Sequence, residues 1–158
     1  MLHTPLLSRS RGAGFRTLGL AGEVHTRRSE MSTQEVANRF HELVSSGQFR
    51  EAMDELYADN ARHVEVMEMP DTPYPRILEG KDKLQEMSEY WERTNEVHDS
   101  SCGKPLVNGE QFICEMMIDT TSSEGPFAGQ RMKMSEQCLY TVENGKITEA
   151  KFFYSMDC

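Results

Sequence analysis

Two Asn-Gly pairs in the second half of the chain, Asn108-Gly109 and Asn144-Gly145, constrain the fold more than any other feature. Both residue types tolerate the positive φ that a two-residue hairpin turn requires, and each pair adjoins segments with the composition of strands. The second half is therefore predicted to be an antiparallel meander. Its expected strands are Gln111–Thr120, Arg131–Glu143 and Lys146–Ser155.

The first half shows the period of amphipathic helices instead. The four residues Ser32-Thr33-Gln34-Glu35 have the pattern of a capping box, in which a hydroxyl and a carboxylate satisfy free backbone donors at a helix start. Ser45-Ser46-Gly47 predicts the end of that helix. A second, short helix is expected to begin near Phe49 and to end near Asp59-Asn60, and a third to cover about Lys81 to Asn95.

Two further segments lie between the second and third predicted helices. Residues His63–Met67 are rich in β-branched residues and alternate, which predicts a strand. The segment Met69–Gly80 contains three prolines and is predicted to be a loop, because proline disrupts both helices and strand ladders.

This order, with helices gathered before most of the strands, predicts the α+β class with the helices on one face of a mostly antiparallel sheet. A strongly twisted sheet of this size curls. Three helices are too few to fill its concave side, so we expect the curved sheet to enclose a pocket.

Residues 1–30 have a different composition from the rest of the chain. They carry five arginines and two acidic residues, both near the end of the segment, whereas the remaining residues carry 12 basic and 24 acidic side chains. An Arg-rich, acid-poor start suits a mitochondrial or plastid transit peptide. The alternative is an extension without targeting function, in a cytoplasmic protein, or translation from Met31. In either case residues 1–30 are expected to be disordered, and the domain to span residues 31–158.

The charge pattern and the cysteines exclude several classes of function. The strongly acidic domain repels phosphate backbones, so no nucleic-acid partner is expected. No apolar stretch is long enough for a membrane helix, so no membrane association is expected. The four cysteines form no CxxC pair and have no zinc spacing, and no P-loop or dinucleotide fingerprint occurs. We therefore expect free thiols and neither a metal nor a cofactor. The cysteines are Cys102, Cys114, Cys138 and Cys158.

Three titratable side chains are candidate catalytic residues. Glu65 alternates with Val64, so it points to the face of its strand that also carries His63 and Met67. If that face is concave, burial raises the pKa of the carboxyl and suits it for proton abstraction. The alternatives are a solvated strand edge or an ion pair with a nearby arginine.

The second candidate, Glu136, carries the one charge in an otherwise uncharged row on one face of its predicted strand, which requires a partner or a function. The structural alternative is a buried ion pair or hydrogen bond with His98 or Arg131. The third candidate, His98, becomes a proton shuttle if Glu65 or Glu136 lies within hydrogen-bond reach, and is otherwise a structural residue.

Aromatic and sulfur-containing side chains are the expected walls of the pocket. The chain has 11 methionines, whose pliable thioethers suit irregular ligands but also fill gaps in any core. The predicted substrate-binding residues are His63, Met67, Tyr90, Trp91, Met134, Cys138, Tyr140, Phe152 and Tyr154.

From residue 31 onward the chain resembles the SnoaL-like branch of the NTF2-like superfamily, relatives of polyketide cyclases and ketosteroid isomerases. The segments that carry the resemblance are Leu56–Asp59, Val64-Glu65 with Met69-Pro70, Asn95–His98, Gly129–Glu136, Tyr140–Ile147 and Phe152–Tyr154.

The resemblance implies a cone-shaped domain that pairs as a homodimer through the outer sheet face, and a carboxylate base at the position of Glu65. The isomerases also use a tyrosine of the first helix, where this chain has Phe40 and His41, and a late-strand acid, which falls near Gln137 or Cys138. This departure argues against steroid isomerisation.

These observations predict a SnoaL-like pocket protein that binds a small, largely apolar molecule. Its chemistry would be cofactor-independent acid–base isomerisation, cyclisation or hydrolysis, with Glu65 as base and Glu136 and His98 polarising the substrate. The alternatives are a non-catalytic binding module and a dimeric interaction domain of the same fold, because fold alone does not determine function.

Overall fold

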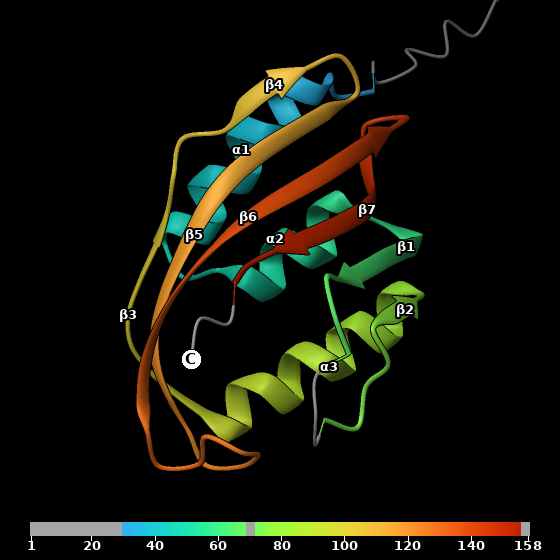
Figure 1. The fold of residues 1–158 in the computed structure, drawn as a ribbon. Coiled ribbons are helices and arrows are strands. Elements are labelled where there is room, and N and C mark those ends of the chain that lie inside the picture. Colours follow the sequence, from blue (N-terminus) through green and yellow to red (C-terminus); the bar gives the residue numbers. More distant parts are fainter. Residues whose placement is uncertain (1–29, 69–71, 156–158) are drawn as a thin grey trace, which may run out of the picture.

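A computed structural model describes residues 30–68 and 72–155 of the chain (Figure 1). The predicted targeting segment, apart from Glu30, lies outside the described residues, as do Met69, Pro70 and Cys158. The described part contains three helices and seven strands. In chain order these are α1 (Thr33–Ser45), α2 (Phe49–Leu56), β1 (Tyr57–Glu65), β2 (Ile77–Glu79), α3 (Lys81–Thr94), β3 (Asn95–Cys102), β4 (Leu106–Asn108), β5 (Gln111–Ser122), β6 (Arg131–Glu143) and β7 (Lys146–Phe153).

The start of α1 confirms the predicted capping box. The backbone N–H of Ser32 donates to Glu35 Oε2 at 2.7 Å, and the Ser32 hydroxyl accepts from the Glu35 N–H at 3.3 Å. These two bonds satisfy backbone groups that the first turn of a helix leaves unpaired. The helix ends as predicted at the Ser46-Gly47 pair, where Gly47 adopts a φ of 74°.

The boundary between α2 and β1 differs from the prediction. The helix ends at Leu56, and Tyr57, which was assigned to the helix face, instead begins a nine-residue strand. Tyr57 lies beside Ile147 of β7 in a parallel pairing, and Ala61 is fully buried four residues later. Backbone pairing with β7 and burial of these side chains outweigh the helical preference of the local sequence.

All seven strands of the described residues form one sheet in the order β2-β1-β7-β6-β5-β3, with β4 paired to β5. The β1–β7 pair is parallel and the other pairs are antiparallel. Asn144 and Gly145 adopt φ values of 50° and 72° in the β6–β7 turn, as the predicted hairpin requires. The short strand β2 lies inside the segment predicted to be only a loop, where it pairs with β1.

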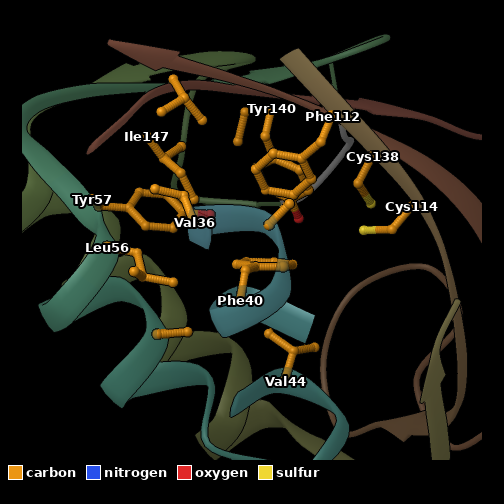
Figure 2. Close-up of a cluster of buried hydrophobic side chains, with 14 of the residues drawn as sticks. Val36, Phe40, Val44, Leu56, Tyr57, Phe112, Cys114, Cys138, Tyr140 and Ile147 are labelled. Atoms are coloured by element: carbon orange, nitrogen blue, oxygen red, sulfur yellow. The ribbon is translucent and has the colours of Figure 1, made fainter. Parts of the chain in front are cut away.

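The sheet curves around the helices, with α1 and α2 on its concave side and α3 along the end formed by β1 and β2 (Figure 1). The buried core lies between α1 and the strands β5, β6 and β7 (Figure 2). At its centre the Phe40 ring lies 5.6 Å from Phe112 and 4.6 Å from Tyr140, measured between ring centroids. None of the helices in the described ranges is long and apolar enough to cross a membrane.

Candidate functional site

The burial of the side chains on the concave face of β6 changes along the strand. From Cys138 to Val142, its inward-facing side chains are buried in the core under α1. The inward-facing residues before that point, Met132, Met134 and Glu136, are only half-buried. The candidate site lies at this transition, where the sheet face remains concave and the α1 core has ended.

Three neighbouring strands bring the polar groups of the site together. Glu65, the last residue of β1, lies opposite Phe152 of β7, and Phe152 in turn lies opposite Cys138 of β6. Glu136 and Tyr154 each lie one residue beyond the Gln137–Phe153 pair, so they occupy facing positions at the end of the β6–β7 ladder. The pairing of β1, β7 and β6 therefore brings together two carboxylates and a phenol from three distant segments of the sequence.

Glu65 is held by two side chains. His63 Nε2 lies 2.5 Å from Glu65 Oε1, and the side chains of these residues are 12% and 23% exposed. The Tyr154 hydroxyl also hydrogen-bonds to Glu65, and burial together with this carboxylate raises the pKa of Tyr154. His63 is fixed from its other side by stacking on Phe152, with 4.4 Å between ring centroids. A carboxylate has about four acceptor sites, so these two donors leave Glu65 able to accept further hydrogen bonds.

Glu136 is the second carboxyl of the site. Burial, reinforced by the charge of Glu65, raises its pKa to about 7, whereas a hydrogen bond from the Cys138 thiol at 3.7 Å acts in the opposite direction. A pKa near neutrality means that a large fraction of Glu136 is protonated at neutral pH and can donate a hydrogen bond. The structure thus places a carboxyl that is partly protonated at neutral pH near the Glu65 carboxyl group, an arrangement suited to general acid–base chemistry.

His98 lies apart from this pair. Its Nε2 is 2.8 Å from the Thr121 hydroxyl and its Nδ1 is 3.9 Å from Glu96, both at the β3–β5 edge. Arg131 binds Asp119 through two bonds of 2.7 and 2.8 Å. The ion-pair or hydrogen-bond partner predicted for Glu136 is therefore neither His98 nor Arg131, and the imidazole that contacts Glu65 is that of His63. The alternation of His63 and Glu65 along one strand was the sequence signal for this pair, and only the structure brings their side chains into contact.

Four of the predicted pocket-lining residues belong either to the core or to the surroundings of Glu65. Tyr140 and Cys138 are 1% and 0% exposed, and the Tyr140 ring stacks on Phe112, so both belong to the core. The half-buried Phe152 and Tyr154 contact the Glu65–His63 pair, as described above.

Of the remaining predicted lining residues, Tyr90 and Trp91 lie on α3, Met134 lies on β6 and Met67 follows the end of β1. Met134 and Trp91 are half-buried, and Met67 is 38% exposed. The Tyr90 hydroxyl, on α3, donates to Glu124 at 2.7 Å. A role in ligand binding stays a prediction for each of these residues.

A shallow hollow lies elsewhere, across β3, β5 and β6. Its lining includes Asp99, Met117, Asp119 and Lys133, and from the predicted site it includes Met134. Glu65 and Glu136 do not line it. The enclosed pocket at the carboxylate pair therefore stays a prediction. In residues 30–68 and 72–155, no three His, Cys, Asp or Glu side chains are grouped so that they could hold a metal ion.

Comparison with known proteins identifies the family and the fold. The sequence model of the SnoaL-like domain family matches residues 31–154. A solved structure from Mesorhizobium loti, provisionally named a SnoaL-like polyketide cyclase with the added designation carbohydrate phosphatase, is 38% identical. That match covers 78% of this chain and 100% of the M. loti chain, with a TM-score of 0.72.

More distant structures share the fold. A provisionally named polyketide cyclase from Pseudomonas putida KT2440 is 15% identical, with a TM-score of 0.60 over 80% of this chain and 94% of that one. An NTF2-like protein from Anabaena variabilis ATCC 29413 is 16% identical, with a TM-score of 0.56 over 79% and 90% of the two chains. No curated protein matches the chain.

Proposed function

The chain belongs to the SnoaL-like domain family, and from that premise we propose that it binds a small, largely apolar organic molecule and performs cofactor-independent acid–base chemistry on it. The site of this activity is the concave end of β1, β7 and β6. Glu65 is the general base, Glu136 is the acid that polarises the substrate, and His63 and Tyr154 position Glu65.

The observation that carries the proposal is the raised pKa of Glu136 beside Glu65. A half-buried carboxyl with a pKa raised to about 7 lies close enough to Glu65 to respond to its charge. A carboxyl whose pKa is raised toward neutrality beside a second carboxyl is a usual arrangement for moving a proton within one site. The neighbouring Phe152 ring provides apolar surface for the substrate.

The reaction class that fits this pair is proton transfer at a carbon next to a carbonyl group. Glu65 takes the proton, the electron pair of the C–H bond moves into the carbonyl, and Glu136 donates a hydrogen bond to the oxygen that becomes negative. Return of the proton to another carbon completes an isomerisation. Attack of the carbanion on a second carbonyl forms the new C–C bond of a cyclisation.

A deuterium-exchange experiment tests the base. A panel of cyclic ketones and β-diketones is first screened for ligands that raise the melting temperature, and exchange of the α-hydrogens in D₂O is then followed by NMR. We expect Glu65→Gln to retain binding and to slow exchange by roughly 10²- to 10⁴-fold, the usual contribution of a positioned base. The matched control is Glu143→Gln, which removes an exposed carboxylate at the far end of β6.

The possible results separate the candidate functions. Exchange that proceeds equally fast in the wild type and in Glu65→Gln would show that the assigned base is wrong. Saturable binding without any exchange would instead favour the non-catalytic binding module of the same fold.

We also propose that two copies pair through the outer face of the sheet. The outward-facing Met117 and Phe153 are 49% and 46% exposed, and Ile113 lies opposite Leu139 on the same face. Exposed apolar groups that follow neighbouring strands favour association. Light scattering should give twice the 18.1 kDa chain mass, and Phe153→Asp should shift it toward the monomer. A monomeric wild type at micromolar concentration would contradict the pairing.

A further inference from the structure

We propose that Cys102 and Cys114 form a peroxide-reactive dithiol that closes to an intramolecular disulfide. This site lies at the end of β3 and is independent of the acid–base chemistry proposed for Glu65 and Glu136. The three described cysteines, Cys102, Cys114 and Cys138, are all free thiols in the structure.

The strand pairing places the two thiols on one face of the sheet. Cys102 is the last residue of β3 and lies opposite Met116 of β5, so Cys114 is its diagonal neighbour on the same face. The side chains of Cys102 and Cys114 interact with each other, and the Cys102 thiol donates to the Gly103 carbonyl at 3.6 Å. The backbone keeps this arrangement, because the Gly103 N–H donates to the Glu115 carbonyl at 2.7 Å.

The two thiols differ in access and in chemical state. Cys102 is half-buried, and its interactions with Cys114 and with His41 of α1 lower its pKa. Cys114 is 2% exposed, and its interaction with Cys102, followed by burial, raises its pKa. Cys102 is therefore the thiol that an oxidant reaches as a thiolate, whereas Cys114 is shielded and reacts only with a group already held beside it.

Cys138 is a poor competitor for the same reaction. It lies directly opposite Cys114 in the β5–β6 ladder, and Figure 2 shows both sulfurs within the buried cluster. However, Cys138 is 0% exposed, and burial raises its pKa, so it stays a protonated thiol. Its hydrogen bond is directed to Glu136.

The chemistry needs only a hydroperoxide as the oxidant. The Cys102 thiolate attacks one peroxide oxygen, so that an S–O bond forms, the O–O bond breaks, and the leaving alkoxide or hydroxide takes up a proton. The sulfur loses two electrons and the peroxide gains them. The Cys114 thiol then gives up its proton and attacks the sulfenic sulfur, the S–S bond forms, the S–O bond breaks, and water leaves. One hydroperoxide thus consumes two thiols.

Closing the disulfide requires a small backbone movement. Diagonal neighbours in a sheet have Cα atoms roughly 7–8 Å apart, whereas a disulfide joins Cα atoms at about 4.4–6.8 Å. The movement would have to stretch or open the hydrogen bond between the Gly103 N–H and the Glu115 carbonyl, which is the bond that follows the last residue of β3.

Thiol mapping on the full chain tests the inference, in a Cys158→Ser background that removes the fourth thiol. After treatment with one equivalent of hydrogen peroxide, free thiols are alkylated and the unreduced protein is digested for mass spectrometry. We expect a peptide linked through Cys102 and Cys114, loss of two thiols per peroxide, and full recovery with dithiothreitol. A Cys114–Cys138 link, or three thiols that stay reduced, would overturn the proposal.

Two variants test the order of the steps. In Cys114→Ala, the sulfenic acid of Cys102 has no partner and should be trapped by dimedone, and circular dichroism checks that the variant is folded. In Cys102→Ser, the buried Cys114 should stay reduced over the same time. Oxidation of Cys114 at an undiminished rate in Cys102→Ser would show that Cys102 is not the reactive thiol, and would contradict the assigned sequence.

Discussion

The two ends of the concave face of β6 differ although they belong to one strand and one sheet. At the closed end, which we define by Cys138, Tyr140 and Val142, every inward side chain is at most 4% exposed and packs under α1. At the open end, defined by Met132, Met134 and Glu136, the inward side chains are half-buried. The closed end is apolar apart from a phenol and a thiol, whereas the open end carries a carboxyl.

The difference between the two ends shows that the packing of α1 over the sheet, and not the sequence of β6 alone, separates the core from the candidate site. At the closed end Phe40 of α1 contacts the Phe112 and Tyr140 rings, so a charge would lose its hydration without compensation. At the open end the available partners are His63, Glu65 and Cys138, which can interact with a carboxyl. Glu136 therefore survives in a position that is costly for its charge but useful for proton transfer.

The largest effect should come from the closed end. Replacing Phe40 by alanine removes the ring that packs on Phe112 and Tyr140, and we expect a loss of about 3–5 kcal/mol in the free energy of unfolding, as for other buried aromatic residues. Urea denaturation followed by circular dichroism measures this loss. The matched variant at the open end, Met134→Ala, should lose roughly 1–2 kcal/mol, because a half-buried side chain removes less apolar area from water. Equal losses would contradict the contrast between the two ends.

The next prediction concerns Glu136, where the substitution is expected to stabilise the protein and not to destabilise it. Its pKa is raised to about 7 in the folded protein, from an ordinary value of 4.5. The folded state thus holds a proton that the unfolded state releases between pH 4.5 and 7, so stability falls as pH rises through this range. Glu136→Gln should therefore stabilise the protein by about 1–3 kcal/mol at pH 8, and the gain should disappear below about pH 4.5.

Denaturant titrations at pH 4, 6 and 8 measure this dependence. Glu143→Gln, at the exposed end of the same strand, is the control and should change stability little at any of these pH values. A Glu136→Gln variant that is less stable than the wild type at pH 8 would show that the charged carboxylate is well compensated, and would remove the distinction drawn for the open end.

A smaller effect tests the helix that covers the closed end. Ser32→Ala removes the side-chain half of the capping box at the start of α1, and we expect a loss of roughly 1 kcal/mol. The same urea experiment detects it. Thr33→Ala is a suitable control, because it changes the neighbouring hydroxyl residue, which does not form the cap. Equal effects of the two substitutions would show that the cap contributes nothing specific.

Most of the fold could be predicted from the sequence because its signals are local. The capping box at Ser32 and the turn at Asn144-Gly145 each depend on residues within four positions of one another, and both were confirmed. The start of β1 at Tyr57 and the presence of β2 were missed. Both depend on pairing with a distant strand or across a loop, which no local pattern reports.

For the candidate site, too, the local sequence predicts some features, whereas others depend on the pairing of distant strands. Alternation predicted the inward orientation of Glu136 and the shared face of His63 and Glu65, and in the structure His63 contacts Glu65 and Glu136 lies close enough to respond to the charge of Glu65. The contact of Tyr154 with Glu65 depends on the neighbouring positions of β1 and β7, so the sequence could only suggest Tyr154 as part of an apolar wall. His98 was grouped with the carboxylates without evidence for its strand register.

The smallest predicted effect examines the coupling within the open end. The charge of Glu65 contributes to the raised pKa of Glu136, although burial is the larger cause. Glu65→Gln keeps the shape of the side chain and removes the charge, so the pKa of Glu136 should fall while remaining above its ordinary value. Carboxyl ¹³C chemical shifts followed through a pH titration measure it. Glu115→Gln, on the opposite face of β5, should leave the pKa of Glu136 unchanged. A Glu136 pKa that is equally insensitive to Glu65→Gln would mean that the two carboxyls act separately, and a two-carboxyl mechanism would lose its physical basis.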